Sequence, residues 1–198
     1  VTNVANLRNL SAGEDKQVNI LEENGNKYLS VALLASDNDR AINLNKVTSA
    51  ATGIYRVKFS AALTSGSSHA HRTQIALVNG FPGGSSANNP QEDFIFSLDC
   101  NLDSTDDGAG TKTWFINKSD TSVELDAGAW YNFTVLVNTD TKKVTVSIVD
   151  ANGAAVLEAK EFDAAENAVM EAKGIHIRNG RYSSKTLIDN IVVETPEE

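Results

Sequence analysis

Residues 130–153, WYNFTVLVNTDTKKVTVSIVDANG, constrain the fold more than any other part of this chain. Apolar and polar residues alternate over two runs, and a polar turn at 140–143 separates them. Strict alternation is typical of a β-strand with one face in a core, so the segment predicts two antiparallel strands. A second turn follows at 150–153. Similar runs recur along the chain without a convincing long helix, which predicts an all-β, two-sheet antiparallel β-sandwich.

Turn-forming residues separate the other expected strands. Asn24-Gly25 lies between two alternating runs and predicts a tight hairpin, because both residues tolerate positive φ. In 53–63 the apolar set Tyr55, Val57 and Phe59 is expected to face the core. Residues 164–172, AAENAVMEA, are the only helix-like piece and predict one or two helical turns. Further strands are expected at 40–44, 71–80, 92–100, 111–118, 158–163, 173–181 and 186–194.

The length of 198 residues fits one large sandwich, and we expect a single domain over 1–195. Residues 196–198 are expected to begin a linker or to mark the end of an expressed fragment. No apolar run reaches the roughly 18 residues of a membrane helix, so no membrane partner is expected. The start, VTNVANLRNL, lacks the basic and apolar regions of a signal peptide, so a native secretion signal would have to be missing.

The charge balance narrows the possible partners. With 26 acidic and 17 basic side chains, the net charge is -9, which argues against nucleic acid. It argues less strongly against acidic polysaccharides, because a local cluster of Arg and His can act inside an acidic protein. Cys100 is the only cysteine, so the chain has no intrachain disulfide. We interpret Cys100 as a small buried hydrophobic residue.

Two motifs carry a resemblance to a known superfamily. WYNFTVLVNTDTKKVTVSIVDANG and the terminal LIDNIVV resemble strands of concanavalin A-like lectin/glucanase, or laminin-G-like, jelly rolls of the carbohydrate-binding-module type. The similarity is best over 130–195. It implies two curved sheets and a concave face that holds a glycan. We also expect a monomeric module of a larger bacterial enzyme, secreted or at the cell surface, that degrades plant or algal polysaccharide.

Alternation places several polar side chains on one predicted face. If Ile175 and Ile177 point into the core, His176 and Arg178 lie on the opposite face. In 71–80, Gln74 and Arg72 would likewise lie outside. If these two strands are neighbours in the concave sheet, they form a polar, partly cationic groove. The alternative is that both are ordinary solvated faces with ion pairs.

Sugar rings also need a flat aromatic surface and polar groups for their hydroxyls. Trp114 alternates with Phe115, so one of the two must face away from the core; the alternative is that Trp114 is the core residue. Trp114 or Tyr182 is therefore the expected stacking platform. Asn179 is expected to join Arg72, Gln74 and Arg178 in holding hydroxyls or carboxylates. Trp130 is expected in the core or at a corner of the sandwich.

Two patterns raise the question of a metal. Asp99, Asn101 and Asp103 have a spacing reminiscent of a calcium loop, but Ser104 stands where an EF-hand needs glycine. We favour an acidic surface loop and keep structural calcium as a candidate, with Asp189 as a separate possible ligand. His69 and His71 share a face but lack a visible third ligand. No other cofactor is expected.

The sequence does not favour catalysis. Glycosidases of this fold class need two carboxylates flanking the scissile bond, and no strand offers such a pair. A polysaccharide lyase acting on a uronate polymer is the alternative, with Tyr182, His71 and Arg72 as its residues. A structural or adhesion sandwich without a glycan ligand is the third reading. We favour a non-catalytic carbohydrate-binding module.

Overall fold

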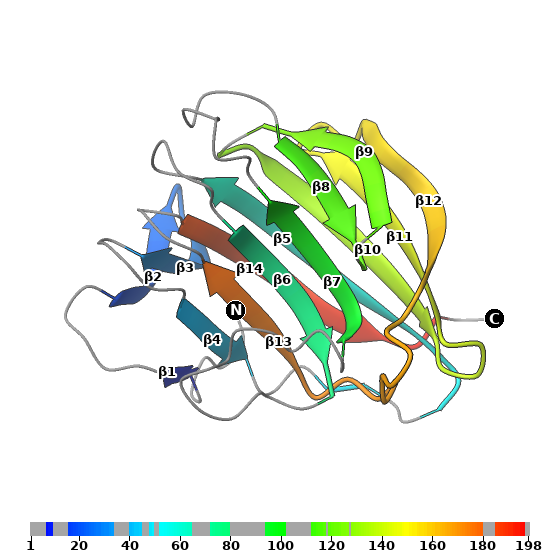
Figure 1. The fold of residues 1–198 in the computed structure, drawn as a ribbon. Coiled ribbons are helices and arrows are strands. Elements are labelled where there is room, and N and C mark those ends of the chain that lie inside the picture. The colour runs from blue at the N-terminus through cyan, green and yellow to red at the C-terminus, as the bar shows by residue number, and fades with distance from the viewer. Residues whose placement is uncertain are drawn as a thin grey trace.

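The structure is a computed structural model, and it describes residues 7–9, 16–33, 40–44, 48–49, 52–64, 72–79, 94–101, 112–117, 119–126, 128–179 and 185–196. These residues form two seven-stranded antiparallel sheets that face each other (Figure 1). The front sheet has the order β1 (Leu7–Asn9), β4 (Arg40–Leu44), β13 (Gly174–Asn179), β6 (Arg72–Val78), β7 (Phe94–Asn101), β8 (Lys112–Ile116) and β9 (Ser119–Leu125). The back sheet has the order β12 (Ala155–Asp163), β11 (Lys143–Asp150), β10 (Trp130–Asn138), β5 (Ile54–Thr64), β14 (Lys185–Glu194), β3 (Asn26–Leu33) and β2 (Lys16–Glu23).

The core lies between the sheets and follows the predicted alternation. Tyr55, Val57 and Phe59 of β5 are buried, as expected. Phe59 pairs directly with Phe133 of β10, and their rings stack with centroids 4.8 Å apart. The predicted all-β sandwich is therefore confirmed, and each sheet has one face in the core and one face turned away from it.

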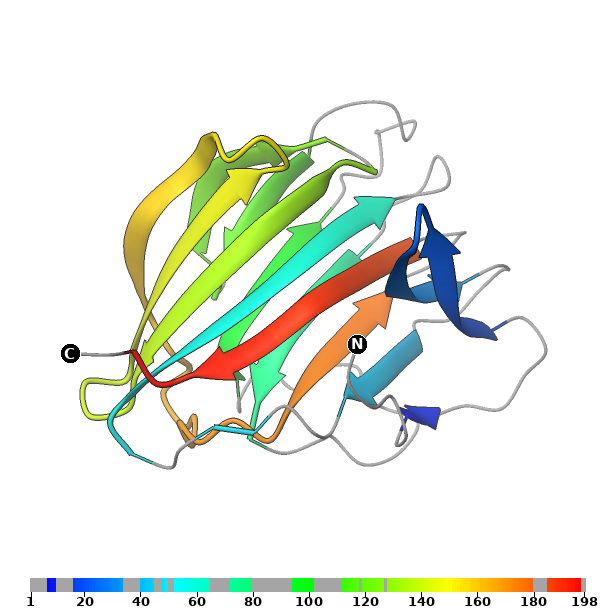
Figure 2. The same cartoon turned by 180° about the vertical axis from the view of Figure 1, so that it is seen from behind.

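The hairpin predicted at Asn24-Gly25 joins β2 to β3. Asn24 has a φ of 53° and Gly25 a φ of 79°, so both adopt the left-handed conformation of a two-residue turn. The register runs from Glu23 opposite Asn26 to Lys16 opposite Leu33. The turn therefore fixes the pairing of this edge of the back sheet (Figure 2).

The closing motif LIDNIVV contains a β-bulge. The register of β14 against β5 shifts between Asp189 and Val192, and Asn190 has a φ of 54°. The Nδ2 of Asn190 donates to Ser60 Oγ at 3.2 Å, and Asn26 Nδ2 donates to Asp189 Oδ2 at 2.9 Å. The Asp189-Asn190 pair thus stabilises the bulge. Asparagine tolerates the left-handed backbone conformation, and its amide bonds the neighbouring strand.

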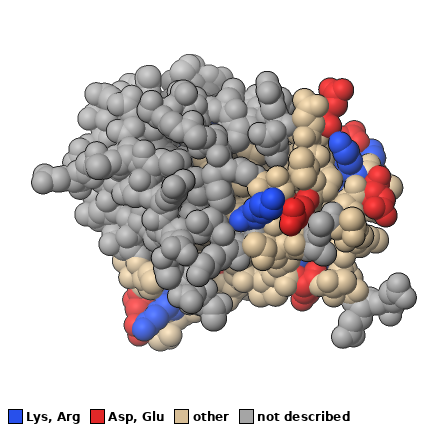
Figure 3. All heavy atoms as spheres, turned by 90° about the horizontal axis from the view of Figure 1, so that it is seen from below, with Lys and Arg blue, Asp and Glu red and all other residues tan. Residues whose placement is uncertain are grey.

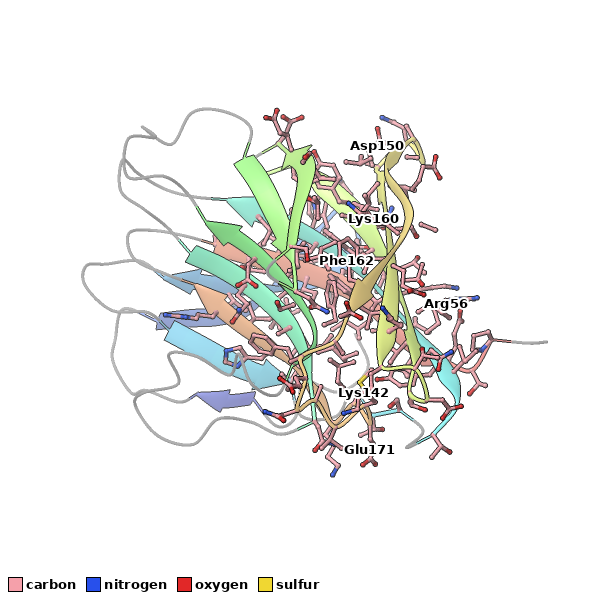
Figure 4. The ribbon with its side chains drawn as sticks, turned by 45° about the vertical axis from the view of Figure 1, so that its right-hand side comes forward. Arg56, Lys142, Asp150, Lys160, Phe162 and Glu171 are labelled. Atoms are coloured by element: carbon pink, nitrogen blue, oxygen red, sulfur yellow. The ribbon has the colours of Figure 1, made fainter. Side chains whose placement is uncertain are left out.

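The helix predicted over 164–172 is wrong. This segment instead spans one end of the sandwich, where Glu171 is labelled in Figure 4. Tyr55 Oη donates to the Met170 carbonyl at 2.7 Å, and Ala165 N donates to the Phe94 carbonyl at 3.1 Å. Both bonds tie the segment to strands of different sheets, and these tertiary hydrogen bonds outweigh the helix propensity of its alanines.

Two strands were not predicted, β1 and β9. The described residues form no helix, and so none that could cross a membrane.

Candidate functional site

The outer face of the front sheet, turned away from the back sheet, carries a group of buried polar side chains. We call it the outer polar cluster, and it consists of Gln74, Ser97, Asp99, His176 and Arg178. On the same strands Ile175 and Ile177 are core residues, as are Ile75 and Leu77. Alternation along each strand therefore turns the polar set outward.

The strand register brings the cluster together across three neighbouring strands. Arg178 of β13 lies opposite Gln74 of β6, which lies opposite Asp99 of β7. In the next row, Ala76 separates His176 from Ser97. Paired side chains on one face of an antiparallel sheet lie roughly 5 Å apart. The condition that the two strands carrying Gln74 and Arg178 are neighbours is therefore met.

Hydrogen bonds hold the carboxylate at one end of the cluster. Gln74 Nε2 donates to Asp99 Oδ1 at 2.5 Å, and Ser97 Oγ donates to Asp99 Oδ2 at 2.8 Å. The amide of Gln74 is thereby oriented, and its Oε1 accepts no hydrogen bond from the described residues. An oriented acceptor of this kind suits a hydroxyl or amide donor from a ligand.

Burial sets the electrostatics of the cluster. Gln74 and His176 are 0% exposed and Arg178 is 5% exposed, so the alternative of an ordinary solvated face is wrong for these three residues. Burial lowers the pKa of His176 from 6.5 to about 4, and it also lowers the pKa of Arg178. His176 is therefore neutral at pH 7, while Arg178 remains charged because an arginine pKa begins far above that pH.

An apolar group adjoins the polar one. Ala76, Val78 and Phe94 form a buried cluster separate from the main core. Ala76 lies between His176 and Ser97 in the register, so the two clusters are contiguous on this sheet. Oriented polar groups beside apolar ones are the usual composition of a site for a small organic ligand.

The other predicted ligand-binding residues fall only partly within the described structure. Arg72 lies opposite Asn101, Trp114 lies opposite Cys100 and Val123, and Asn179 lies opposite Thr73. The side chains of these residues are not described. Three further residues lie outside the described residues: Tyr182, His69 and His71. Their proposed contacts with a glycan stay predictions.

The calcium predictions are not tested. Within the described residues no group of three His, Cys, Asp or Glu could hold a metal ion. Asp99 is a strand residue bonded to Gln74 and Ser97, and Asp189 accepts a hydrogen bond from Asn26. Asp103 lies outside the described residues.

Trp130 was expected in the core or at a corner of the sandwich, and the core alternative is wrong. Tyr131 and Phe133 point into the core, so Trp130 lies on the outer face of the back sheet, where it is half-buried. Its ring meets that of Tyr28 edge-on, with centroids 5.5 Å apart. Strict alternation with Tyr131 was the signal in the sequence that could have placed it.

Comparisons with known proteins bear on the fold. No protein-family model and no curated protein matches this sequence. A solved β-glucanase catalytic domain of glycoside hydrolase family 131 from Podospora anserina has a TM-score of 0.60 at 10% identity, over 87% of this chain and 73% of that one. A lectin from Bauhinia forficata in complex with GalNAc has a TM-score of 0.51 at 10% identity, over 94% of each chain.

A chain described as a sialidase has a TM-score of 0.56 at 11% identity. The match covers 86% of the present chain but only 16% of that protein. Likeness at this level of identity concerns the fold. The glucanase domains and legume lectins found in this way share one architecture. The chain therefore has the fold of the concanavalin A-like jelly rolls, the superfamily that its residues 130–195 resemble.

Proposed function

We propose that this protein is a carbohydrate-binding β-sandwich and that the outer polar cluster of the front sheet contacts the glycan. The observation that carries the proposal is the burial of five polar side chains on a sheet face that does not pack against the other sheet. Burying polar and charged groups costs free energy that an apolar face would not cost. Proteins keep such costly arrangements mainly where a function requires them.

The chemistry of the cluster suits sugar hydroxyls. Gln74 Oε1 is an oriented acceptor, and the guanidinium of Arg178 supplies donors in a planar fork. Because both side chains are buried, the proposal requires that glycan binding uncovers them. Arg72, Trp114, Asn179 and Tyr182 remain the proposed flanking contacts. The solved lectin with GalNAc, a protein of the same fold, supports a glycan as the ligand class. We propose a non-catalytic module that recognises a plant or algal polysaccharide within a secreted bacterial enzyme.

Affinity electrophoresis of the purified chain against soluble polysaccharides tests this function. We expect one glycan class to retard the protein, and Gln74→Ala and Arg178→Lys to weaken that retardation. Lys58→Ala is the matched control, because Lys58 lies half-exposed on the opposite face of the molecule. A repeat with EDTA tests the proposed structural calcium. If no glycan retards the protein, the structural or adhesion reading replaces this one.

One observation favours a second function, a lyase acting on a uronate polymer. Neutral His176 stands two residues from Arg178 on the same face, so a proton acceptor lies beside a cation that can neutralise a uronate carboxylate. In such an elimination the base takes the proton at C5, and the C4–O bond breaks. A C4=C5 double bond forms, and the leaving oxygen takes up a proton.

This second function uses His176 and Arg178, whereas the lyase alternative in the sequence analysis named Tyr182, His71 and Arg72. Incubation of the chain with alginate and with polygalacturonate, followed by ultraviolet absorbance of the unsaturated product, decides between binding and turnover. Turnover that disappears in His176→Gln would establish a lyase. No absorbance change with either polymer would leave the binding module.

A further inference from the structure

The outer face of the back sheet carries an aromatic and amide surface that the proposed function does not use. We call it the Trp130 strip, and it consists of Tyr28, Trp130, Asn132 and Asn190. These residues come from β3, β10 and β14, all in the back sheet (Figure 2). The front and back sheets turn their outer faces in opposite directions, so the strip is separate from the outer polar cluster.

Small residues beneath the strip allow its rings to lie against the sheet. Trp130 lies directly opposite Ala62, and Asn132 lies directly opposite Ser60. Ala62 is fully buried and Ser60 nearly so, although both belong to the outward face. Trp130 itself stays partly exposed and contacts Tyr28 edge-on. The result is an indole fixed in place by a neighbouring ring, with part of its surface in solvent.

Exposed amides lie one row from the indole. Ser60 Oγ donates to Asn132 Oδ1 at 2.7 Å and accepts from Asn190 Nδ2 at 3.2 Å. Among the described residues these bonds engage the oxygen of Asn132 and the nitrogen of Asn190, so the Nδ2 hydrogens of Asn132 and the Oδ1 of Asn190 are left to meet a ligand. Residues two apart on a strand are separated by about 6.7 Å, so a donor and an acceptor stand within reach of a ring seated on Trp130.

The charges around the strip are already paired. Lys58, one row beyond Asn132, binds Glu194 at 2.6 Å, and Arg56 binds the same carboxylate at 2.9 Å. Asp189 accepts a hydrogen bond from Asn26, and Lys185 at the other end also has an interaction partner. In the view of Figure 3 basic and acidic side chains of the described residues are likewise interspersed. The strip offers no cationic surface for a polyanion.

We propose that the Trp130 strip is a second carbohydrate-contact site, which binds a neutral polysaccharide with a pyranose ring stacked on Trp130 and its hydroxyls bonded to Asn132 and Asn190. An indole packs well against the apolar C–H face of a sugar, and amides pair with hydroxyls. A docking protein would need a continuous apolar patch. The exposed large hydrophobics of the described residues are instead scattered, at Ile20, Ile54, Val169 and Val192.

The test uses the ¹⁵N-labelled full chain, whose two tryptophans give two indole N–H signals. The Trp130 signal is assigned with Trp130→Phe, and the chain is titrated with cellohexaose, xylohexaose and mannohexaose. The affinities for hydroxyethyl cellulose and carboxymethyl cellulose are then compared, because these polymers share one backbone but are neutral and anionic, respectively. We expect at least one hexaose to shift the Trp130 signal and the neutral polymer to bind more tightly.

Variants complete the test. Trp130→Phe and Asn132→Ala are expected to weaken binding about tenfold. Thr145→Ala is the control and should bind as the parent does. Thr145 lies on the same face of β11, two rows away from the row of Asn132. Gln74→Ala should leave the Trp130 shift intact, which separates this site from the outer polar cluster.

Three results would overturn the proposal: no sugar shifts the Trp130 signal, Asn132→Ala binds as tightly as the parent, or the signal moves with protein concentration in the absence of sugar. The last result would assign the strip to self-association.

Discussion

Single residues decide how far alternation can predict a site. The pattern in 71–80 and 173–181 correctly placed Gln74, His176 and Arg178 on one face, because strand parity is a local property. Their burial could not be predicted, since it depends on what covers a sheet face in the folded chain. Trp130 shows the reverse case, because the core was kept open for this large aromatic residue although its neighbour Tyr131 already held the inward position.

His176 provides a stability test at this scale. Its pKa is lowered by burial from 6.5 to about 4, so between these values the unfolded chain binds a proton that the folded chain does not. The free energy of unfolding should therefore fall as the pH drops through this window, by at most about 3 kcal/mol. Urea unfolding at several pH values measures it. His176→Gln should show a shallower fall, and parallel pH profiles for both proteins would contradict the assignment.

Asn190 provides a second stability test at the residue scale. Its φ of 54° is unfavourable for other side chains, and its amide bonds Ser60. We predict that Asn190→Ala lowers the free energy of unfolding by about 1–2 kcal/mol, through backbone strain and loss of that bond. Asn190→Gly should cost less because glycine accepts the conformation. Equal losses in the two variants, measured by urea unfolding, would show that the backbone conformation is not the cause.

At the scale of elements, the sequence predicted a strand wherever alternation was regular. β9 was not predicted because its residues Ser119–Leu125 are mostly polar. Ser122 also has a φ of 56°, which interrupts the strand. The segment 164–172 was mistaken for a helix because alanine favours helices locally. Its backbone bonds to Tyr55 of the back sheet and to Phe94 of the front sheet are long-range and leave no local pattern.

The pairing of β5 with β10 can be tested through its central ring pair. Phe59 and Phe133 are both almost fully buried and stack face to face. Phe133→Ala should lower the free energy of unfolding by about 3–5 kcal/mol, because it removes a ring and leaves a cavity. Thr134→Ala, the next residue on the outer face, is the control and should change it by about 0.5 kcal/mol or less. A small effect of Phe133→Ala would mean that the core refills the space.

For the whole molecule, the order of strands matters more than their number. β14 is the last strand in the chain, yet it lies between β5 and β3 inside the back sheet. Its Ile188 is a core residue. The two halves of the back sheet therefore meet only through the end of the chain. The expectation of one domain over 1–195 stays a prediction.

Truncation tests this dependence. Removal of residues 185–198 should abolish the cooperative unfolding transition, because β5 and β3 lose their shared neighbour. Removal of 196–198 alone should leave the transition unchanged. Circular dichroism during thermal unfolding distinguishes the two, and a folded product of the longer deletion would show that the back sheet can close without β14.

The position of β14 also governs how the protein is made. A chain that leaves the ribosome or a translocation pore from its N-terminus delivers β5 early and β14 about 130 residues later. At ordinary synthesis rates this interval lasts on the order of 10 seconds, and throughout it β5 and β3 have edges without their final neighbour. Such edges pair readily with other chains. Chaperones, or export before folding, would protect these edges until β14 completes the back sheet.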